Sequence, residues 1–268
     1  MNIGLLIVGD EILSGKRADK HLPKVIELLA ARGLALTWAR YVGDDPARIT
    51  ADLKDAFASA DLVFSCGGIG ATPDDHTRQC AAAALGVPLE LHPQARDFVI
   101  ERMKDVAREN GTTFDPERED NRHRLNMAVF PAGAEIIPNP YNKIAGFAIR
   151  SGAGGVFFVP GFPVMAWPMI EWVLDTHFRH LHVAPSTQER SVIVFGAMEA
   201  ALTPLMEAIE REFAGIKVFS LPSVDHPDWG RHIELGVKGR LALLEAAYAR
   251  LREGLERTGA KLGPELVR

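Results

Sequence analysis

Cysteine is scarce in this sequence, and long apolar runs are absent. The only two cysteines, Cys66 and Cys80, match no metal-binding or redox spacing, so both thiols are expected to be reduced and packed inside the protein. No apolar stretch reaches the ~18 residues that a membrane-spanning helix needs. The apolar run from Ile3 to Val8 lacks a basic start and is soon followed by an acid, which indicates a buried strand and not a signal peptide. These absences predict a cytoplasmic protein without membrane contact.

Positive charge is also not in excess. The chain has 30 Lys and Arg against 35 Asp and Glu, for a net charge of -5. A general nucleic-acid binder needs a basic face that displaces counterions from phosphates, so no nucleic-acid partner is expected. A small anionic ligand stays possible, because a local pocket can oppose the global charge. Hydrophobic residues make up 47% of the chain, which is ordinary for a globular protein with a core.

Short apolar runs alternate with helical patterns over residues 1–185. This alternation predicts an α/β domain with a mostly parallel, doubly wound sheet. Strands are expected at 3–8, 34–42, 62–66, 134–137, 146–150 and 156–159. Helices are expected between the first three strands, then to about residue 85, over 92–110, from 115 to about 127, and from 163 to near 182.

The pattern restarts after Pro185-Ser186, which we take as the domain boundary. A strand, a helix, two strands and a helix are expected over residues 191–195, 203–213, 216–220, 232–237 and 240–257. Residues 186–268 are therefore predicted to form a small α+β accessory domain of β-α-β-β-α order. Its acids follow an ordinary amphipathic pattern, so no catalytic group is expected there.

An acidic pair follows each of the first three predicted strands. The pairs are Asp10-Glu11, Asp44-Asp45 and Asp74-Asp75. In open α/β sheets, ligands bind beyond the carboxyl ends of the strands. Carboxylate oxygens at that edge are suitable ligands for Mg²⁺. Three acidic pairs at one edge therefore indicate a cation site as well as a ligand site.

Helix capping is the alternative explanation for these acids. Asp45 stands before Pro46 as an N-cap stands before a first-turn proline. Thr72 and Asp75 have the spacing of a capping box. Either explanation holds for a single pair, whereas three pairs at one edge are harder to ascribe to capping alone.

A glycine loop, Gly67-Gly68-Ile69-Gly70, joins the third predicted strand to a helix. Glycines allow the backbone to approach a phosphate, and the helix N-terminus supplies free N–H groups. The loop is not the dinucleotide-binding fingerprint, because the G-x-G-x-x-G spacing is absent. The sequence of this loop is compatible with a phosphate site and with a simple tight turn.

Several motifs occur in a characteristic order. They are Gly9-Asp10-Glu11-Ile12-Leu13-Ser14-Gly15, Asp19, Val42-Gly43-Asp44-Asp45, Gly67 to Thr77, Pro131-Ala132-Gly133-Ala134, Asn139-Pro140 and Pro160-Gly161-Phe162-Pro163. Together they resemble the molybdopterin-binding domain family. This domain occurs in molybdenum-cofactor biosynthesis proteins and as the N-terminal half of competence/damage-inducible protein A (CinA). The resemblance covers residues 1 to about 180 and continues more weakly beyond them.

The resemblance implies a three-layer α/β/α domain that binds a phosphorylated pterin such as molybdopterin, or a nucleotide, at the strand ends. In CinA-type relatives this site is linked to divalent-metal-dependent cleavage of nucleotide pyrophosphates such as ADP-ribose or FAD. One alternative is an enzyme of molybdenum-cofactor assembly that adenylylates molybdopterin. Another is a binding module without chemistry. Relatives are commonly oligomeric, so a homo-oligomer is expected.

The resemblance also assigns roles to residues. Asp44 and Asp75 match the functional acids and would hold Mg²⁺ or another divalent metal, and we expect them in one cleft near the glycine loop. The ligand-binding residues it implies are Gly9, Asp10, Glu11, Ser14, Gly15, Asp19, Gly67, Gly68, Ile69, Gly70, Asp74, Thr77, Asn139, Gly146, Pro160 and Gly161.

Two features depart from the family pattern. The family's A-P-G stretch after Asn-Pro is represented by Asn142-Lys143-Ile144-Ala145-Gly146, which has no proline. In full-length CinA proteins a separate amidase domain follows, and with the sequence ending at Arg268 we expect none here.

Overall fold

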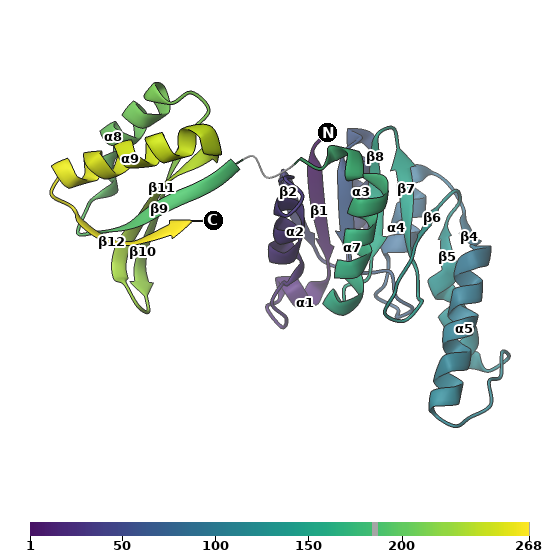
Figure 1. The fold of residues 1–268 in the computed structure, drawn as a ribbon. Coiled ribbons are helices and arrows are strands. Elements are labelled where there is room, and N and C mark those ends of the chain that lie inside the picture. The colour runs from purple at the N-terminus through teal and green to yellow at the C-terminus, as the bar shows by residue number, and fades with distance from the viewer. Residues whose placement is uncertain (184–186, 268) are drawn as a thin grey trace. The chain divides into compact units, whose positions relative to one another are not determined.

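The computed structural model describes residues 1–183 and 187–267. The chain divides into two compact units, Met1–His182 and Val183–Arg268 (Figure 1). The boundary predicted at Pro185-Ser186 lies outside the described residues. Each unit has its own hydrophobic core.

The first unit is built on a six-stranded sheet of order β2-β1-β3-β8-β7-β6. The strands are β1 (Ile3–Val8), β2 (Trp38–Val42), β3 (Leu62–Cys66), β6 (Glu135–Ile137), β7 (Gly146–Ser151) and β8 (Gly154–Val159). The strands β2, β1, β3 and β8 pair in parallel. The β7 strand runs antiparallel to both β8 and β6. The predicted mostly parallel, doubly wound sheet is confirmed.

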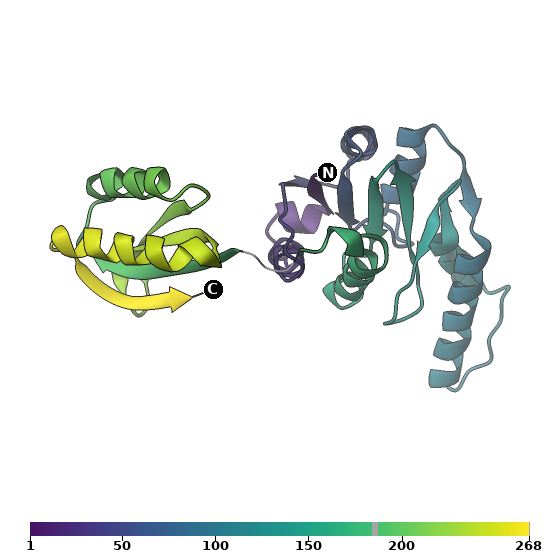
Figure 2. The same cartoon turned by 45° about the horizontal axis from the view of Figure 1, so that its top comes forward.

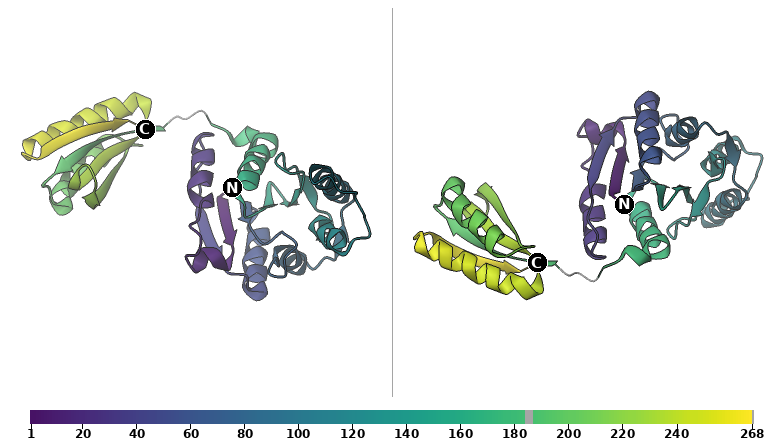
Figure 3. Two further views of the ribbon diagram at one scale, coloured as in Figure 1. Left: turned by 90° about the horizontal axis from the view of Figure 1, so that it is seen from below. Right: turned by 90° about the horizontal axis from the view of Figure 1, so that it is seen from above.

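Helices cover both faces of this sheet (Figures 1 and 3). On one face lie α2 (His21–Ala30) and α7 (Pro163–His177). On the other lie α3 (Pro46–Ser59), α4 (Thr77–Leu85) and α5 (Pro93–Glu109). Every residue of β1, β3 and β8 is buried, as expected for strands covered on both faces. The unit is therefore a three-layer α/β/α domain.

A small ribbon extends this domain at the α4 side. It consists of β4 (Leu89–Leu91) and β5 (Val129–Pro131), which pair antiparallel. Neither strand was predicted. The helix expected from residue 115 to 127 is instead a short helix, α6 (Glu119–Arg124), followed by a 3-10 turn, η1 (Leu125–Ala128). One further short helix, α1 (Asp10–Leu13), follows β1, and a 3-10 turn, η2 (Arg179–Leu181), follows α7.

The second unit is a four-stranded antiparallel sheet of order β10-β11-β9-β12 with two helices on one face (Figure 2). Its elements are β9 (Thr187–Phe195), α8 (Glu199–Glu212), β10 (Lys217–His226), β11 (Gly230–Arg240), α9 (Leu241–Arg257) and β12 (Lys261–Val267). The predicted β-α-β-β-α order therefore lacks the last strand. The sequence of β12 contains Gly263-Pro264, which interrupts the apolar alternation.

No helix in the described part of the chain is long and apolar enough to cross a membrane.

The separate cores predict that the first unit folds by itself. Residues 1–182 expressed alone should give a cooperative thermal transition, because the buried side chains of that unit pack among themselves. Circular dichroism and a thermal melt of the fragment would measure this. A fragment that is unfolded, while the full chain is folded, would contradict it.

Candidate functional site

The carboxyl ends of four parallel strands meet at one edge of the first unit's sheet. Two backbone hydrogen bonds continue the pairing beyond the strand ends. The Gly9 N–H donates to the Val42 carbonyl, and the Gly67 N–H donates to the Val159 carbonyl, both over 3.0 Å. The loops that follow β1, β2, β3 and β8 therefore start side by side, and these loops contain most of the predicted site residues.

The glycine loop folds closely over β1 and α4. Gly67 has φ +106°, and a Cβ there would lie 2.3 Å from the Val8 carbonyl oxygen. Gly68 has φ +67°, and a Cβ there would lie 2.2 Å from Thr77 Oγ1. Both positions therefore require glycine. The buried Thr77 holds the loop, because its hydroxyl donates to the Gly67 carbonyl (3.1 Å) and its N–H to the Gly68 carbonyl (3.0 Å).

The next residues of this loop expose backbone and not side chains. Ile69 is buried in the core between the sheet and α3, α4 and α5, so its side chain does not face a ligand. In the described part of the chain, the backbone N–H groups of Gly68, Ile69 and Gly70 make no hydrogen bond. Successive free N–H groups in such a turn form a concavity that suits an anion.

Asp75 lies against the end of this loop. Its carboxylate accepts hydrogen bonds from the Thr72 N–H (2.8 Å) and the Thr72 hydroxyl. A Cβ on Gly70 would lie 2.5 Å from Asp75 Oδ2, so the carboxylate is next to the loop backbone. The capping-box interpretation of Thr72 and Asp75 is wrong. The helix α4 begins only at Thr77, and the two residues close a turn before it.

Asp10 and Asp44 form a reciprocal pair between the loops after β1 and β2. The Asp10 N–H donates to Asp44 Oδ2 (2.9 Å), and the Asp44 N–H donates to Asp10 Oδ1 (3.1 Å). Gly43 is required between them, because a Cβ there would lie 2.3 Å from Asp10 Oδ1. Asp45, in contrast, caps α3 as predicted, accepting from the Arg48 N–H (2.9 Å).

Like charges surround Asp44. Burial raises the pKa of its carboxyl group most, and the Asp10 N–H opposes that shift. The negative charges of Asp10, Glu11 and Asp74 raise the pKa further. Asp44 therefore lies within electrostatic range of the loop that carries Asp74 and Asp75. A cation at this edge would relieve the repulsion.

The protein alone does not offer a complete metal shell here. Among the residues that the structure describes, no group of three or more His, Cys, Asp or Glu side chains could hold a metal ion. Mg²⁺ typically combines one or two carboxylates with waters and substrate phosphates. A single carboxylate such as that of Asp44 or Asp75 fits that mode, in which waters and ligand oxygens complete the coordination.

Asp19 has a structural task in addition to its place near the site. Its carboxylate accepts from the N–H groups of His21 (2.8 Å) and Leu22 (3.1 Å), at the start of α2. It also accepts from the Tyr41 hydroxyl (2.8 Å). Burial and this hydrogen bond raise the pKa of Tyr41 to about 12. Asp19 therefore orders the edge of the sheet, and three of its acceptor positions are already used.

Asn139 organises the loop in which the family's proline is missing. Its Nδ2 donates to Asn142 Oδ1 (2.8 Å) and to the Ile144 carbonyl (2.9 Å), and its Oδ1 accepts from the Tyr141 N–H (3.0 Å). These bonds fix the loop without the proline. Gly146 is packed against β8, where a Cβ would lie 2.3 Å from the Phe158 carbonyl oxygen. Both residues thus shape the loop.

The remaining predicted residues lie at the same edge. Ser14 and Gly15 end α1, with Gly15 at φ +73°. Pro160 and Gly161 follow β8, and Gly161 is close to the glycine loop, because a Cβ there would lie 3.5 Å from the Gly67 Cα.

His21 is a residue that the sequence analysis did not single out. Its ring is buried, and Nε2 lies 3.0 Å from the Gly161 carbonyl oxygen. It links α2 to the loop after β8, across 140 positions of sequence. No sequence signal marks such a histidine, because its partner is a backbone carbonyl.

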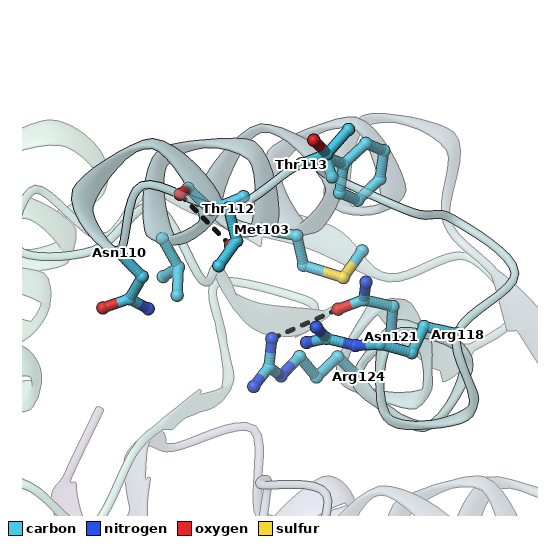
Figure 4. A pocket seen from close by; sticks show the side chains of 10 residues that line it. Met103, Asn110, Thr112, Thr113, Arg118, Asn121 and Arg124 are labelled. Carbon is cyan, nitrogen blue, oxygen red and sulfur yellow. Dashed lines mark hydrogen bonds between the residues drawn. The ribbon is translucent and has the colours of Figure 1, made fainter.

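The cavities of this unit include a larger and a smaller one. One, of about 460 Å³, opens beside Asp75 and is lined by Ala71, Thr72, Pro73, Asp75, His76, Arg78, Gln79, Leu89, Asn126 and Val129. The other, of about 140 Å³, lies between α5 and α6, where Arg124 donates to Asn121 Oδ1 (3.2 Å) (Figure 4). The smaller cavity contains none of the predicted site residues.

The fold and the site define an α/β protein with a glycine loop of free backbone N–H groups and with acidic side chains at the strand ends. The family model described as "Probable molybdopterin binding domain" matches residues 4–180, and the chain belongs to this family. This confirms the resemblance inferred from the motifs.

Known proteins extend this comparison. A CinA-like protein of Anaeromyxobacter dehalogenans (strain 2CP-C) is 38% identical over 175 residues, which is 65% of this chain and 40% of that protein. A CinA-like protein of Anaeromyxobacter sp. (strain Fw109-5) is 34% identical over 212 residues, 77% of this chain and 49% of that protein. The chain thus spans half or less of these curated relatives. The crystal structure of CinA, a protein with unknown function from Thermoplasma acidophilum, is similar with a TM-score of 0.56 at 25% identity, covering 65% of this chain and 98% of that chain.

Asp44→Asn should stabilise the protein at neutral pH. Because the folded state raises the pKa of this carboxyl group, ionised Asp44 destabilises the fold. That penalty is absent below the unfolded-state pKa and complete above the folded-state pKa. The variant's gain in melting temperature should therefore appear as the pH rises through this window and persist to about pH 8. Asp45→Asn is the matched control, since asparagine also caps helices. A lower melting temperature for Asp44→Asn at neutral pH would contradict this reading.

The glycine loop gives a second prediction. Gly68→Ala should abolish anion binding, because the new Cβ would meet Thr77 Oγ1 and displace the loop. Gly86→Ala is the control: Gly86 has a similar φ of +70°, but a Cβ there meets nothing within 4 Å. Titration with inorganic pyrophosphate would measure binding. Equal binding by both variants would show that the loop does not hold the anion.

Proposed function

We propose that this protein binds a phosphorylated pterin or a nucleotide at the strand ends of its first unit, and that it hydrolyses a pyrophosphate linkage with the help of a divalent cation. The observation that carries the proposal is the row of unbonded N–H groups from Gly68 to Gly70 beside Asp75. Membership of the molybdopterin-binding domain family and similarity to CinA-like proteins support the choice of ligand.

The loop after β3 would hold a phosphate. Its free N–H groups stand at the entry to α4, where the helix dipole also favours negative charge. Asp75 cannot itself attract the phosphate, since both are negative. A divalent cation held by Asp75 and the phosphate oxygens would offset this repulsion and polarise the linkage.

Asp44 is the better candidate for the general base. Its carboxyl pKa is raised by burial and by neighbouring acids, which makes the ionised form a stronger proton acceptor. Water would attack one phosphorus, its proton would pass to Asp44, and the bond from that phosphorus to the bridging oxygen would break. The products are two phosphate monoesters. Asp75, fixed by its two bonds from Thr72, would keep its position during the reaction.

Product analysis separates this function from its alternatives. Hydrolysis of ADP-ribose gives AMP and ribose 5-phosphate. Adenylylation of molybdopterin would instead require a pterin acceptor and would leave an adenylylated product. A binding module would show affinity for these ligands and no products.

Incubation with ADP-ribose or FAD, with and without Mg²⁺, tests the proposal. Asp44→Asn and Asp75→Asn should each lower kcat by about 100-fold or more, because asparagine can neither accept the proton nor supply the charge. Both variants should keep their fold, since an amide oxygen still accepts the hydrogen bonds described above. Asp45→Asn, one residue from Asp44, should keep wild-type activity. Unchanged turnover in both variants, or metal-independent turnover, would reject the assignment.

A further inference from the structure

The cavity beside Asp75 is larger than a phosphate site requires. Its volume of about 460 Å³ falls within the ~300–1,000 Å³ of pockets that enclose small molecules. Three parts of the chain form it: the loop from Ala71 to His76, the start of α4, and the β4–β5 ribbon with the turn before it. Among the cavity residues, only Asp75 and Thr72, which fixes Asp75, have a role in the site described above.

Arg78 is an incompletely paired cation in the wall of this cavity. The residue is only 4% exposed. Its Nη2 donates to the Gly70 carbonyl, but its buried Nε has no partner, and it forms no ion pair within the described ranges. Burial lowers the pKa of its guanidinium, and the nearby charge of Asp75 opposes that shift. A buried cation with a free donor is unfavourable unless an anion completes its contacts.

Arginine suits a phosphate, because its planar fork of donors matches two phosphate oxygens. The rest of the wall suits a ring. Pro73, Leu89 and Val129 provide apolar surface, and the exposed Asn126 offers an amide that makes no hydrogen bond in the described part of the chain. An amide can both donate to and accept from the edge of a heterocycle.

We infer that this cavity binds the nucleoside monophosphate portion of the ligand, with Arg78 at its phosphate and Asn126 at its heterocyclic base. The inference rests on the proposed function for the class of ligand. In this arrangement, one half of a dinucleotide-type substrate is enclosed between α4 and the β4–β5 ribbon. Because Asp75 borders the same cavity, the enclosed phosphate lies beside the linkage that would be cleaved.

The test is calorimetric titration of the full chain with AMP. Leu89→Trp should fill the cavity and weaken AMP binding by about 10-fold or more. Leu91→Trp is the control: it lies on the same strand, with an exposure of 46% against 37% for Leu89, but does not line the cavity. Both are partly exposed surface changes that should leave the fold intact.

A charge change gives an independent arm. Asn126→Asp places a negative charge in the cavity and should weaken AMP binding more than adenosine binding. Asn110→Asp, an exposed change in the smaller cavity, should affect neither. Arg78→Lys should reduce the preference for AMP over adenosine, since lysine keeps the charge but loses the fork. AMP binding unaffected by both Leu89→Trp and Asn126→Asp would overturn the inference, as would wild-type protein that does not bind AMP.

Parallel assays with ADP-ribose separate the inference from the proposed function. Suppose that Leu89→Trp weakens AMP binding but the wild-type protein does not hydrolyse ADP-ribose. This outcome would support AMP binding in the cavity and reject the proposed hydrolysis. Hydrolysis of ADP-ribose with a KM that Leu89→Trp leaves unchanged would support the proposed hydrolysis and overturn the assignment of the cavity as a nucleotide site.

Discussion

The parallel register of β2, β1, β3 and β8 is the constraint on which the candidate site depends. Four strands that end at one edge bring together loops separated by more than a hundred residues of sequence. The hydrogen bonds from Gly9 and Gly67 carry the register one residue beyond the strands. Since these strands are buried on both faces, a one-residue shift in register would exchange the side chains that pack in the two cores of the domain. The packing therefore favours one arrangement of the loops.

Close backbone packing turns that edge into a site. At Gly43, Gly67, Gly68 and Gly70 a side chain would collide with atoms of Asp10, Val8, Thr77 and Asp75, respectively. The absence of side chains at these glycines allows the backbone to pack closely. It also leaves peptide N–H groups accessible, and these are the donors that an anion requires. The acids next to these glycines then supply negative charge within a few residues, which accounts for the expected combination of phosphate and divalent cation.

Sequence patterns predicted the central strands because strands buried on both faces appear as continuous apolar runs. They missed β12, where Gly263-Pro264 interrupts the pattern, and the three-residue strands of the ribbon. At the site, the loops could be predicted because they follow the strand ends. The burial of Arg78 and the contact of His21 with Gly161 could not, because segments distant in sequence create both. Capping at Thr72 was expected from spacing alone, and spacing does not show where a helix begins.

The reciprocal contact of Asp10 and Asp44 affects how mutations of these two acids should be interpreted. Each carboxylate orients the peptide of the other, so the two loops are fixed as one part. Replacing Asp10 would displace Asp44. The protein would then lose function even if Asp10 does not contact a ligand. Loss-of-function data from single substitutions would then not show which of the two acids contacts the ligand. The non-additivity of a double-mutant cycle shows that the two residues act as one unit.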